Sequence, residues 1–285
     1  MKTQGIIVLL TVATLACGCL ACPVLGLTGV RGSGRVVEEE REVSGFSGVE
    51  LATPGNLHIE IGGEEELRIE AEDNLMQYFE VEVSGRMLEI KSRPGVSLRP
   101  TKPVHFYLTA TELDTIVLSG SGDVTAPDLE GERISVTISG SGDVRTGDLD
   151  ADKVEVRISG SGDMDISGSE SREQEVTISG SGDAEIGDLN ADRLSVQISG
   201  SGTLGIQGGQ VEEQNVTLNG SGDYEARHLE SDEASVRING SGSTTIQVDE
   251  RLEARIIGSG DVRYAGSPTV ELSVTGSGDV VRIGN

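Results

Sequence analysis

The chain has 285 residues and a formal net charge of −26, from 22 basic and 48 acidic side chains. Such an acidic surface repels phosphate backbones, which disfavours nucleic acid as a partner of the folded body. Aromatic residues make up 2% of the chain, Trp is absent and Gly occurs 40 times. This composition argues against a wide globular core and favours a thin aliphatic core with many chain reversals.

The first segment is typical of an export signal. Lys2 precedes an apolar run that ends in small residues, and the three cysteines of the chain, Cys17, Cys19 and Cys22, follow it. The pattern resembles a bacterial lipobox, in which the signal is cut and the new N-terminal cysteine is acylated. We predict acylation at Cys19, with Cys17 as the alternative. An uncleaved membrane anchor and an ordinary cleaved signal remain open.

The predicted organisation has three parts. A signal peptide with a lipobox-like end covers residues 1–19, and a flexible tether containing Gly, Ser and Pro covers residues 20–36. A β-rich domain covers residues 37–285, and its cysteine-free sequence excludes disulfides and thiol chemistry there. This order predicts an exported protein that is anchored in the cell envelope by a lipid and faces away from the cytoplasm.

Residues 37–118 alternate apolar and polar side chains in several short segments, such as the runs that begin at Leu57 and Leu67. Five of the seven aromatic residues fall in this region. The segments are less regular than those that follow. We therefore expect residues 37–118 to form irregular first coils, or a cap, continuous with the domain behind them.

A repeat dominates residues 119–285. Copies of SGSG or NGSG recur at a constant spacing from Ser119 through Ser139 and Ser159 to Asn239, and two further copies follow at a slightly shorter spacing. Each unit has an alternating segment such as the one from Ile134 to Ile138, then a GSG turn in which Gly can adopt positive φ. An Asp, a second short alternating stretch and a polar corner complete the unit.

One unit, of about 20 residues, buries too few apolar side chains to fold alone, so each must pair with its neighbours. Equivalent strands stacked about 4.8 Å apart achieve this. The predicted fold class is all-β, a single-stranded parallel β-helix (β-solenoid) of about 20 residues per coil with an irregular β-rich N-terminal cap. A sandwich of antiparallel hairpins is the alternative. A β-propeller is disfavoured because one blade needs about 40 residues.

The order of segments resembles a known bacterial family. REVSGFSGVEL is followed by GNLHIEIGGEEELRIEAEDNLMQYFEVEV, then by MLEI, LTATELDTIVLSGSGDV and iterated SGSGD turns. Together they resemble the family named putative auto-transporter adhesin, head GIN domain. The resemblance implies an exported β-helical protein, often a lipoprotein, without established catalysis. The long regular repeat is the main departure of this chain.

The residue after each GSG is usually Asp, and stacked coils would align these carboxylates in a ladder. The members are Asp123, Asp143, Asp163, Asp183, Asp223, Asp261 and Asp279. One interpretation is weak cation binding, but the ladder is interrupted at Thr203 and Ser243, whereas shared ions need continuous ligands. The alternative is that Asp after Gly is ordinary turn chemistry, which we prefer. We therefore predict no metal site and no cofactor.

No residue pattern indicates catalysis. The three histidines, His58, His105 and His228, lie far apart in sequence, and no Ser-His-Asp signature is present. His58 and His105 lie within alternating segments, which predicts that they are exposed strand residues. The sequence distinguishes no carboxylate pair for glycoside hydrolysis.

We therefore predict a non-enzymatic, adhesin-like binding module anchored in the cell envelope, with an envelope protein or a glycan as its ligand. A structural or sensory envelope protein coupled to a membrane regulator is the first alternative. A glycan-active β-helix enzyme is the second.

Overall fold

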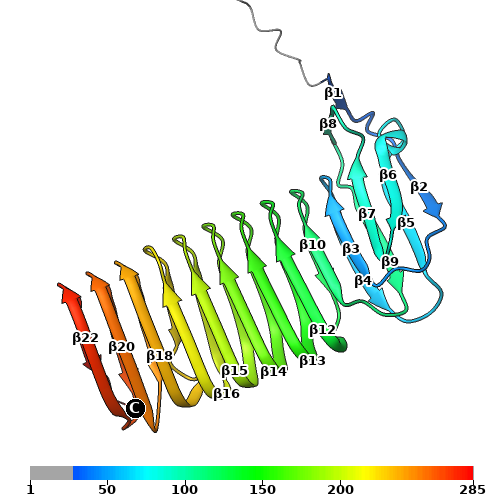
Figure 1. Cartoon of the computed structure of the whole chain (residues 1–285). Helices are drawn as coiled ribbons and strands as arrows, with labels where there is room; N and C mark the ends of the chain where they lie inside the picture. The colour runs from blue at the N-terminus through cyan, green and yellow to red at the C-terminus, as the bar shows by residue number, and fades with distance from the viewer. Residues whose placement is uncertain (1–27, 285) are drawn as a thin grey trace, which may run out of the picture.

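The alternating segments form strands that stack along one axis. The computed structural model describes residues 28–284, and Figure 1 shows a long row of coils that continues from a cap at the N-terminal end. Within this range the elements are strands, apart from the 3₁₀ turn η1 (Met76–Tyr78), and no helix is long and apolar enough to cross a membrane. The predicted signal peptide, Cys17 and Cys19 lie outside the described residues.

The coils consist of the strands between successive GSG turns, either one strand that continues around the far bend or two strands that the bend separates. Their bounds are β10 (Thr115–Leu118), β11 (Val124–Ala126), β12 (Leu129–Ile138), β13 (Val144–Ile158), β14 (Met164–Ile178), β15 (Ala184–Ile198), β16 (Thr203–Leu218), β17 (Asp223–Ala226), β18 (Glu230–Gly240), β19 (Ser243–Gln247), β20 (Arg251–Gly258), β21 (Asp261–Ala265), β22 (Thr269–Gly276) and β23 (Val280–Arg282).

The pairing between coils is parallel and follows the repeat. Val156 pairs with Val176 in the regular coils, which matches the longer spacing of the GSG copies. Ile256 pairs with Val274 near the C-terminal end, which matches the shorter spacing there. All pairings described among strands β10 to β23 are parallel. The prediction of a parallel β-solenoid is therefore confirmed, and the sandwich of hairpins is excluded.

The GSG glycines are required by close stacking more than by unusual backbone angles. A Cβ on Gly140 or Gly160 would lie 1.8 Å from the carbonyl oxygen of the glycine one coil earlier. Neither residue has positive φ; at the first glycine of the turn, positive φ begins only at Gly220 (157°). The expectation that these turns use positive φ therefore holds only for the later coils, and tight contact between coils explains the earlier glycines.

The interior of each coil is thin and mostly aliphatic. Val154, Val156 and Ile158 of β13 are fully buried, and the row of Ile158 continues in register with Ile138 and Ile178 of the neighbouring coils.

Polar groups also enter the interior. Gln214 is buried, accepts a hydrogen bond from the Tyr224 hydroxyl (3.2 Å) and donates one to the Ser231 hydroxyl (2.7 Å). These bonds satisfy groups that would otherwise be costly to bury.

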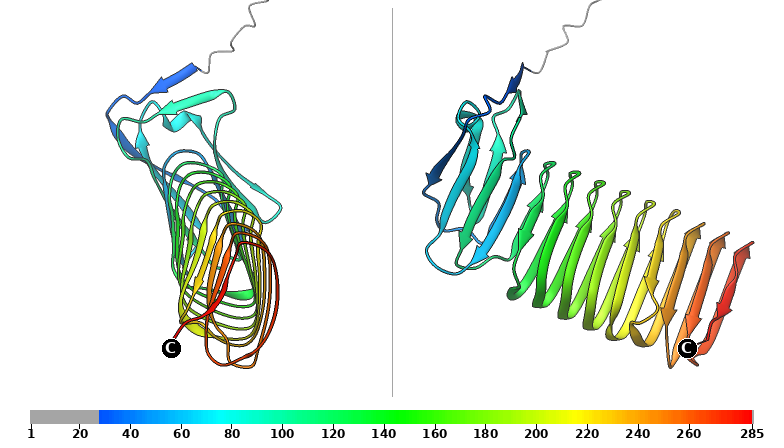
Figure 2. Two further views of the ribbon diagram at one scale, coloured as in Figure 1. Left: turned by 90° about the vertical axis from the view of Figure 1, so that its left-hand side faces the viewer. Right: turned by 180° about the vertical axis from the view of Figure 1, so that it is seen from behind.

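The cap closes the N-terminal end of the solenoid. Its strands are β1 (Thr28–Arg31), β2 (Val36–Arg41), β3 (Gly48–Ala52), β4 (Asn56–Ile61), β5 (Glu66–Glu72), β6 (Phe79–Ser84), β7 (Met87–Ser92), β8 (Val96–Arg99) and β9 (His105–Ala110). Antiparallel pairs β2–β5, β5–β9 and β6–β7 cover this end, as Figure 2 shows from two further sides. Beneath them Phe79 and Phe106 pack edge to face, 5.3 Å apart.

The cap does not follow chain order. Strands β3 and β4 pair in parallel with β10 and β11 of the first regular coil, while β7 and β9, which come later in the chain, pair on their other side. Residues 48–61 are thus inserted between an outer layer and the repeat. Region 37–118 is continuous with the solenoid, as expected, but its coils are stacked in an order that the sequence did not predict.

Part of the predicted tether, residues 20–36, is ordered. Residues 28–31 form β1, which pairs with β8. The connection from β1 to β2 is held by Glu72, whose buried carboxylate accepts hydrogen bonds from the amides of Gly34 (2.5 Å) and Thr101 (2.7 Å). Nonlocal hydrogen bonds fix this segment despite its flexible composition.

Candidate functional site

One continuous face of the molecule carries the predicted aspartate ladder and extends into the cap. We call it the ladder face. It is the outer surface of the strands that follow each GSG turn, namely β11, β17, β19, β21 and the first parts of β13 to β16, together with β4 and β9 of the cap. Parallel pairing makes it a single surface, because β11 joins both β13 and β4, and β4 joins β9.

The ladder carboxylates bind the backbone of the next coil. The Oδ1 atom of Asp123 accepts a hydrogen bond from the Asp143 amide (3.1 Å), Asp143 from Asp163 (3.0 Å), and Asp163 from Asp183 (2.9 Å). At the C-terminal end Asp261 accepts from the Asp279 amide in the same way (3.1 Å). Each of these carboxylates therefore satisfies a turn amide, a structural role that explains Asp at this position.

The interruptions of the ladder follow the same logic. Thr203 donates its amide to Asp183 (2.6 Å) but offers no carboxylate to the next coil, so the amide of Asp223 bonds instead to the Gly202 carbonyl (3.3 Å). Ser243 donates both its amide and its hydroxyl to Asp223, each at 2.7 Å. Within residues 28–284 no group of three or more His, Cys, Asp or Glu side chains could hold a metal ion. Weak cation binding by the ladder stays the alternative interpretation.

A shallow groove of about 550 Å³ lies on the ladder face of the regular coils. Thr203 and Gly205, which are small residues, are among those that line it. Six carboxylates and one arginine line it: Asp143, Asp163, Asp165, Asp183, Glu185, Glu225 and Arg145. Arg145 pairs with the Asp143 carboxylate at 3.5 Å. The other five carboxylates have no cation among the lining residues left to balance them, so the groove carries a strong net negative charge.

The cap end of the ladder face carries a cluster of rings, which we call the ring cluster: His58, His105, Tyr107 and Arg68. The His58 ring stacks on Tyr107 (5.2 Å between centroids), and the Arg68 guanidinium lies over Tyr107 (4.1 Å). His58 Nε2 and His105 Nδ1 are 3.1 Å apart. Burial lowers the pKa of His58 below its ordinary value, and the neighbouring His105 lowers it further.

Sequence reasoning missed the ring cluster. His58 and His105 lie far apart in sequence, but β4 and β9 pair in parallel, and His58 lies opposite Tyr107. The third histidine, His228, is exposed between β17 and β18 of the solenoid, remote from the cap. Alternation indicated correctly that His58 and His105 face outward. No sequence signal gave the pairing, because it depends on the inverted order of the cap layers.

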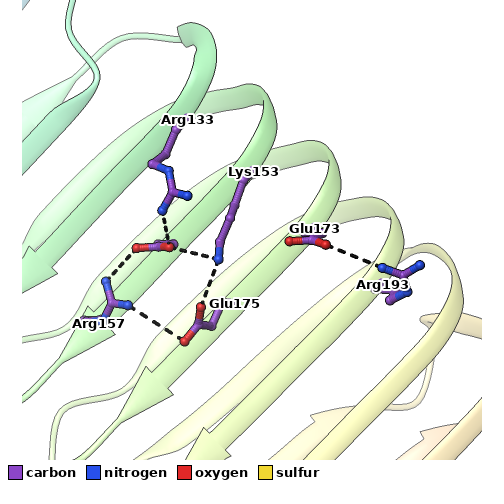
Figure 3. A network of polar contacts seen from close by, with 7 residues as sticks. Arg133, Lys153, Arg157, Glu173, Glu175 and Arg193 are labelled. Atoms are coloured by element: carbon purple, nitrogen blue, oxygen red, sulfur yellow. Dashed lines mark hydrogen bonds and ion pairs between the residues drawn. The ribbon is translucent and has the colours of Figure 1, made fainter.

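The opposite face carries a network of ion pairs (Figure 3). We call this surface, formed by the strands before each GSG turn, the network face. At its centre Glu155 contacts Lys153 (3.0 Å), Arg157 (2.8 Å) and Arg133, while Glu175 lies 3.4 Å from Lys153. The hydrogen bond from Arg157 is the main cause that lowers the pKa of Glu155 to about 2; burial opposes it, and Lys153 adds to the lowering. The network ties three adjacent coils together.

Comparison with known proteins agrees with this architecture. The family model described as putative auto-transporter adhesin, head GIN domain matches residues 45–207 and 170–268. The chain belongs to this family. The resemblance drawn from the sequence is therefore confirmed, and the family model covers most of the cap and most of the repeat. No curated protein matches the chain.

Solved structures of similar fold come from Parabacteroides and Bacteroides. A putative adhesin from Parabacteroides merdae ATCC 43184 is 22% identical with a TM-score of 0.70, covering 90% of this chain and 99% of its own. A putative lipid binding protein from Parabacteroides distasonis ATCC 8503 is 24% identical (TM-score 0.65; 90% and 100%). A putative adhesin from Bacteroides fragilis NCTC 9343 is 22% identical (0.51; 90% and 100%). At these identities the likeness concerns the fold.

Proposed function

We propose that this head GIN domain protein is an exported, envelope-anchored and non-enzymatic binding module, and that the acidic groove of the ladder face is its contact surface. The observation that carries this proposal is the groove, where six carboxylates and a single arginine gather across several coils. A surface of this charge favours a basic segment of an envelope or host protein. A neutral glycan is the alternative ligand.

The placement of the chain ends supports display of this surface. Strand β1 lies at the cap, and the last strands β22 and β23 lie at the other end of the coils (Figure 1). If residues 1–27 include the predicted signal and lipid anchor at Cys19, the anchor joins at the cap and the solenoid projects from it. The groove would then lie along the projecting part.

The other interpretations have less support. The grooves described on the solenoid are lined mainly by polar and charged side chains, which disfavours an acyl chain as ligand. A glycan-active enzyme needs a distinguished acid–base pair, and the groove offers a row of similar carboxylates instead. Coupling to a membrane regulator through the cap remains the alternative function and would give one dominant membrane partner in crosslinking.

The test is binding by a purified chain of residues 28–285, immobilised and presented with basic proteins, envelope proteins and neutral glycans. Reversing the charge of the groove with Glu185→Lys and Glu225→Lys should weaken binding of a basic partner at least about tenfold. Glu253→Lys, an exposed residue in the same row as Glu175 on the network face, is the matched control and should bind like the unmodified chain. Failure to bind any class saturably would refute the proposal.

A further inference from the structure

The two histidines of the ring cluster have the spacing of ligands to one metal ion. His58 Nε2 and His105 Nδ1 are 3.1 Å apart. Two nitrogens bound to the same ion at about 2.0–2.1 Å, with an angle of about 90–110° between the bonds, lie about 2.8–3.4 Å apart. The observed separation falls inside this interval. In the metal-free protein the same spacing allows one ring to donate a hydrogen bond to the other.

The rings are held on a rigid support. His58 and His105 project from adjacent paired strands, and Leu57 and Phe106, which alternate with them, are fully buried. The ring of His58 also stacks on the ring of Tyr107, with 5.2 Å between the centroids. The guanidinium of Arg68 lies over the same Tyr107 ring, 4.1 Å from its centroid. Ligands held by a surrounding shell lose little freedom on binding, which favours affinity.

Conversion from a hydrogen bond to a chelate requires only small changes. Both facing nitrogens must carry lone pairs, so the ring protons move to Nδ1 of His58 and Nε2 of His105, and neutral imidazole permits either tautomer. Each ring must also turn about χ2, so that both lone pairs are directed at one metal position instead of at the other nitrogen. This torsion has a broad minimum in histidine, and both side chains are only partly buried.

We propose that His58 and His105 form a two-histidine chelate for Zn²⁺ or Cu²⁺ on the cap. Imidazole is a preferred ligand of both ions. Because the described residues include no group of three metal-ligating side chains, the chelate leaves coordination positions open to water or to a donor from a bound molecule. The pocket of about 160 Å³ beside His58 is lined by Glu60, Glu66 and Arg68, and Arg68 pairs with Glu38 (3.4 Å), so the carboxylates around the histidines outnumber the cation and attract metal ions. This inference does not depend on the proposed ligand of the groove.

The test is titration of residues 28–285 with Zn²⁺ and Cu²⁺ by calorimetry. This range contains every described strand and omits Cys17, Cys19 and Cys22, which would bind the same ions. We expect one site, and we expect His58→Gln and His105→Gln each to weaken binding at least about tenfold, since loss of a ligand costs no less than loss of a group that only supports a ligand. His228→Gln, the matched control at the remaining histidine, should leave the affinity unchanged.

A second measurement is independent of the folding of the variants. Electron paramagnetic resonance of the Cu²⁺ complex of the unmodified chain should show coupling to two imidazole nitrogens. Equal affinity in the His58→Gln, His105→Gln and unmodified chains, a loss confined to His228→Gln, or a spectrum without two coupled nitrogens would each refute the site. Absence of binding of both ions to the unmodified chain would refute it as well.

Discussion

Replacement of a single GSG glycine tests whether contact between coils dictates the repeat. In Gly160→Ala the new Cβ would lie 1.8 Å from the Gly140 carbonyl oxygen, whereas real Cβ atoms essentially never approach within 3.0 Å. The two coils must therefore move apart locally to accept the methyl group. Gly160 does not have positive φ, so its backbone angles do not by themselves exclude alanine.

The cost follows from the hydrogen bonds that this movement would stretch. The amide of Ser161 bonds to the Gly140 carbonyl at 3.2 Å, and the amide of Ser159 bonds to the Ile138 carbonyl at 2.8 Å. A hydrogen bond contributes about 1 kcal/mol net, and forcing an extra methyl group into a close contact costs about 1–3 kcal/mol. We therefore expect Gly160→Ala to lower the free energy of unfolding by about 2–4 kcal/mol.

Gly205→Ala is the matched control. Gly205 also lies in a coil and also lacks positive φ, but its new Cβ would meet only the Glu185 side chain, at 3.8 Å. We expect no loss, or a gain of up to about 1 kcal/mol because alanine restricts the unfolded chain. Urea denaturation followed by far-ultraviolet circular dichroism suits a chain without Trp. Equal midpoints for Gly160→Ala, Gly205→Ala and the unmodified chain would show that the reasoning is wrong.

Three further predictions concern carboxylates. Glu155→Gln should lower the free energy of unfolding at pH 7 by about 1–2 kcal/mol, because three cations lose their shared carboxylate while solvent screens them. The folded pKa of Glu155, about 2, lies below the ordinary 4.5, so the stabilisation by this carboxylate should be complete above pH 4.5 and fade towards pH 2. Thermal unfolding at several pH values should show this loss in the unmodified chain and not in Glu155→Gln. Asp163→Ala should lower the urea midpoint because the Asp183 amide loses its acceptor, whereas Asp163→Asn, which keeps Oδ1, should not; equal losses would assign the effect to charge. Glu72→Gln should speed hydrogen exchange in β1 and β8 but not in the distant coils, and uniform exchange would argue against a local role.

Local regularity explains why the solenoid could be predicted. Apolar residues at alternate positions, as at Ile134, Val136 and Ile138, define one buried face, and the constant spacing of the GSG copies defines where each strand turns. Only parallel stacking in that register lets each coil bury its apolar face and pair its backbone. The role of each ladder Asp needed the structure, because its partner is an amide one full coil away.

The spatial order of the cap strands could not be predicted from the sequence. Alternation established that His58 and His105 lie on outward-facing strand positions, but the order of the strands in space was not encoded by any repeat. The segment of residues 48–61 is stacked between β10 and a layer formed later in the chain, because antiparallel closure buries Phe79 and Phe106 at the end of the solenoid. That tertiary choice alone brings the two imidazoles to 3.1 Å and orders residues 28–31 against β8.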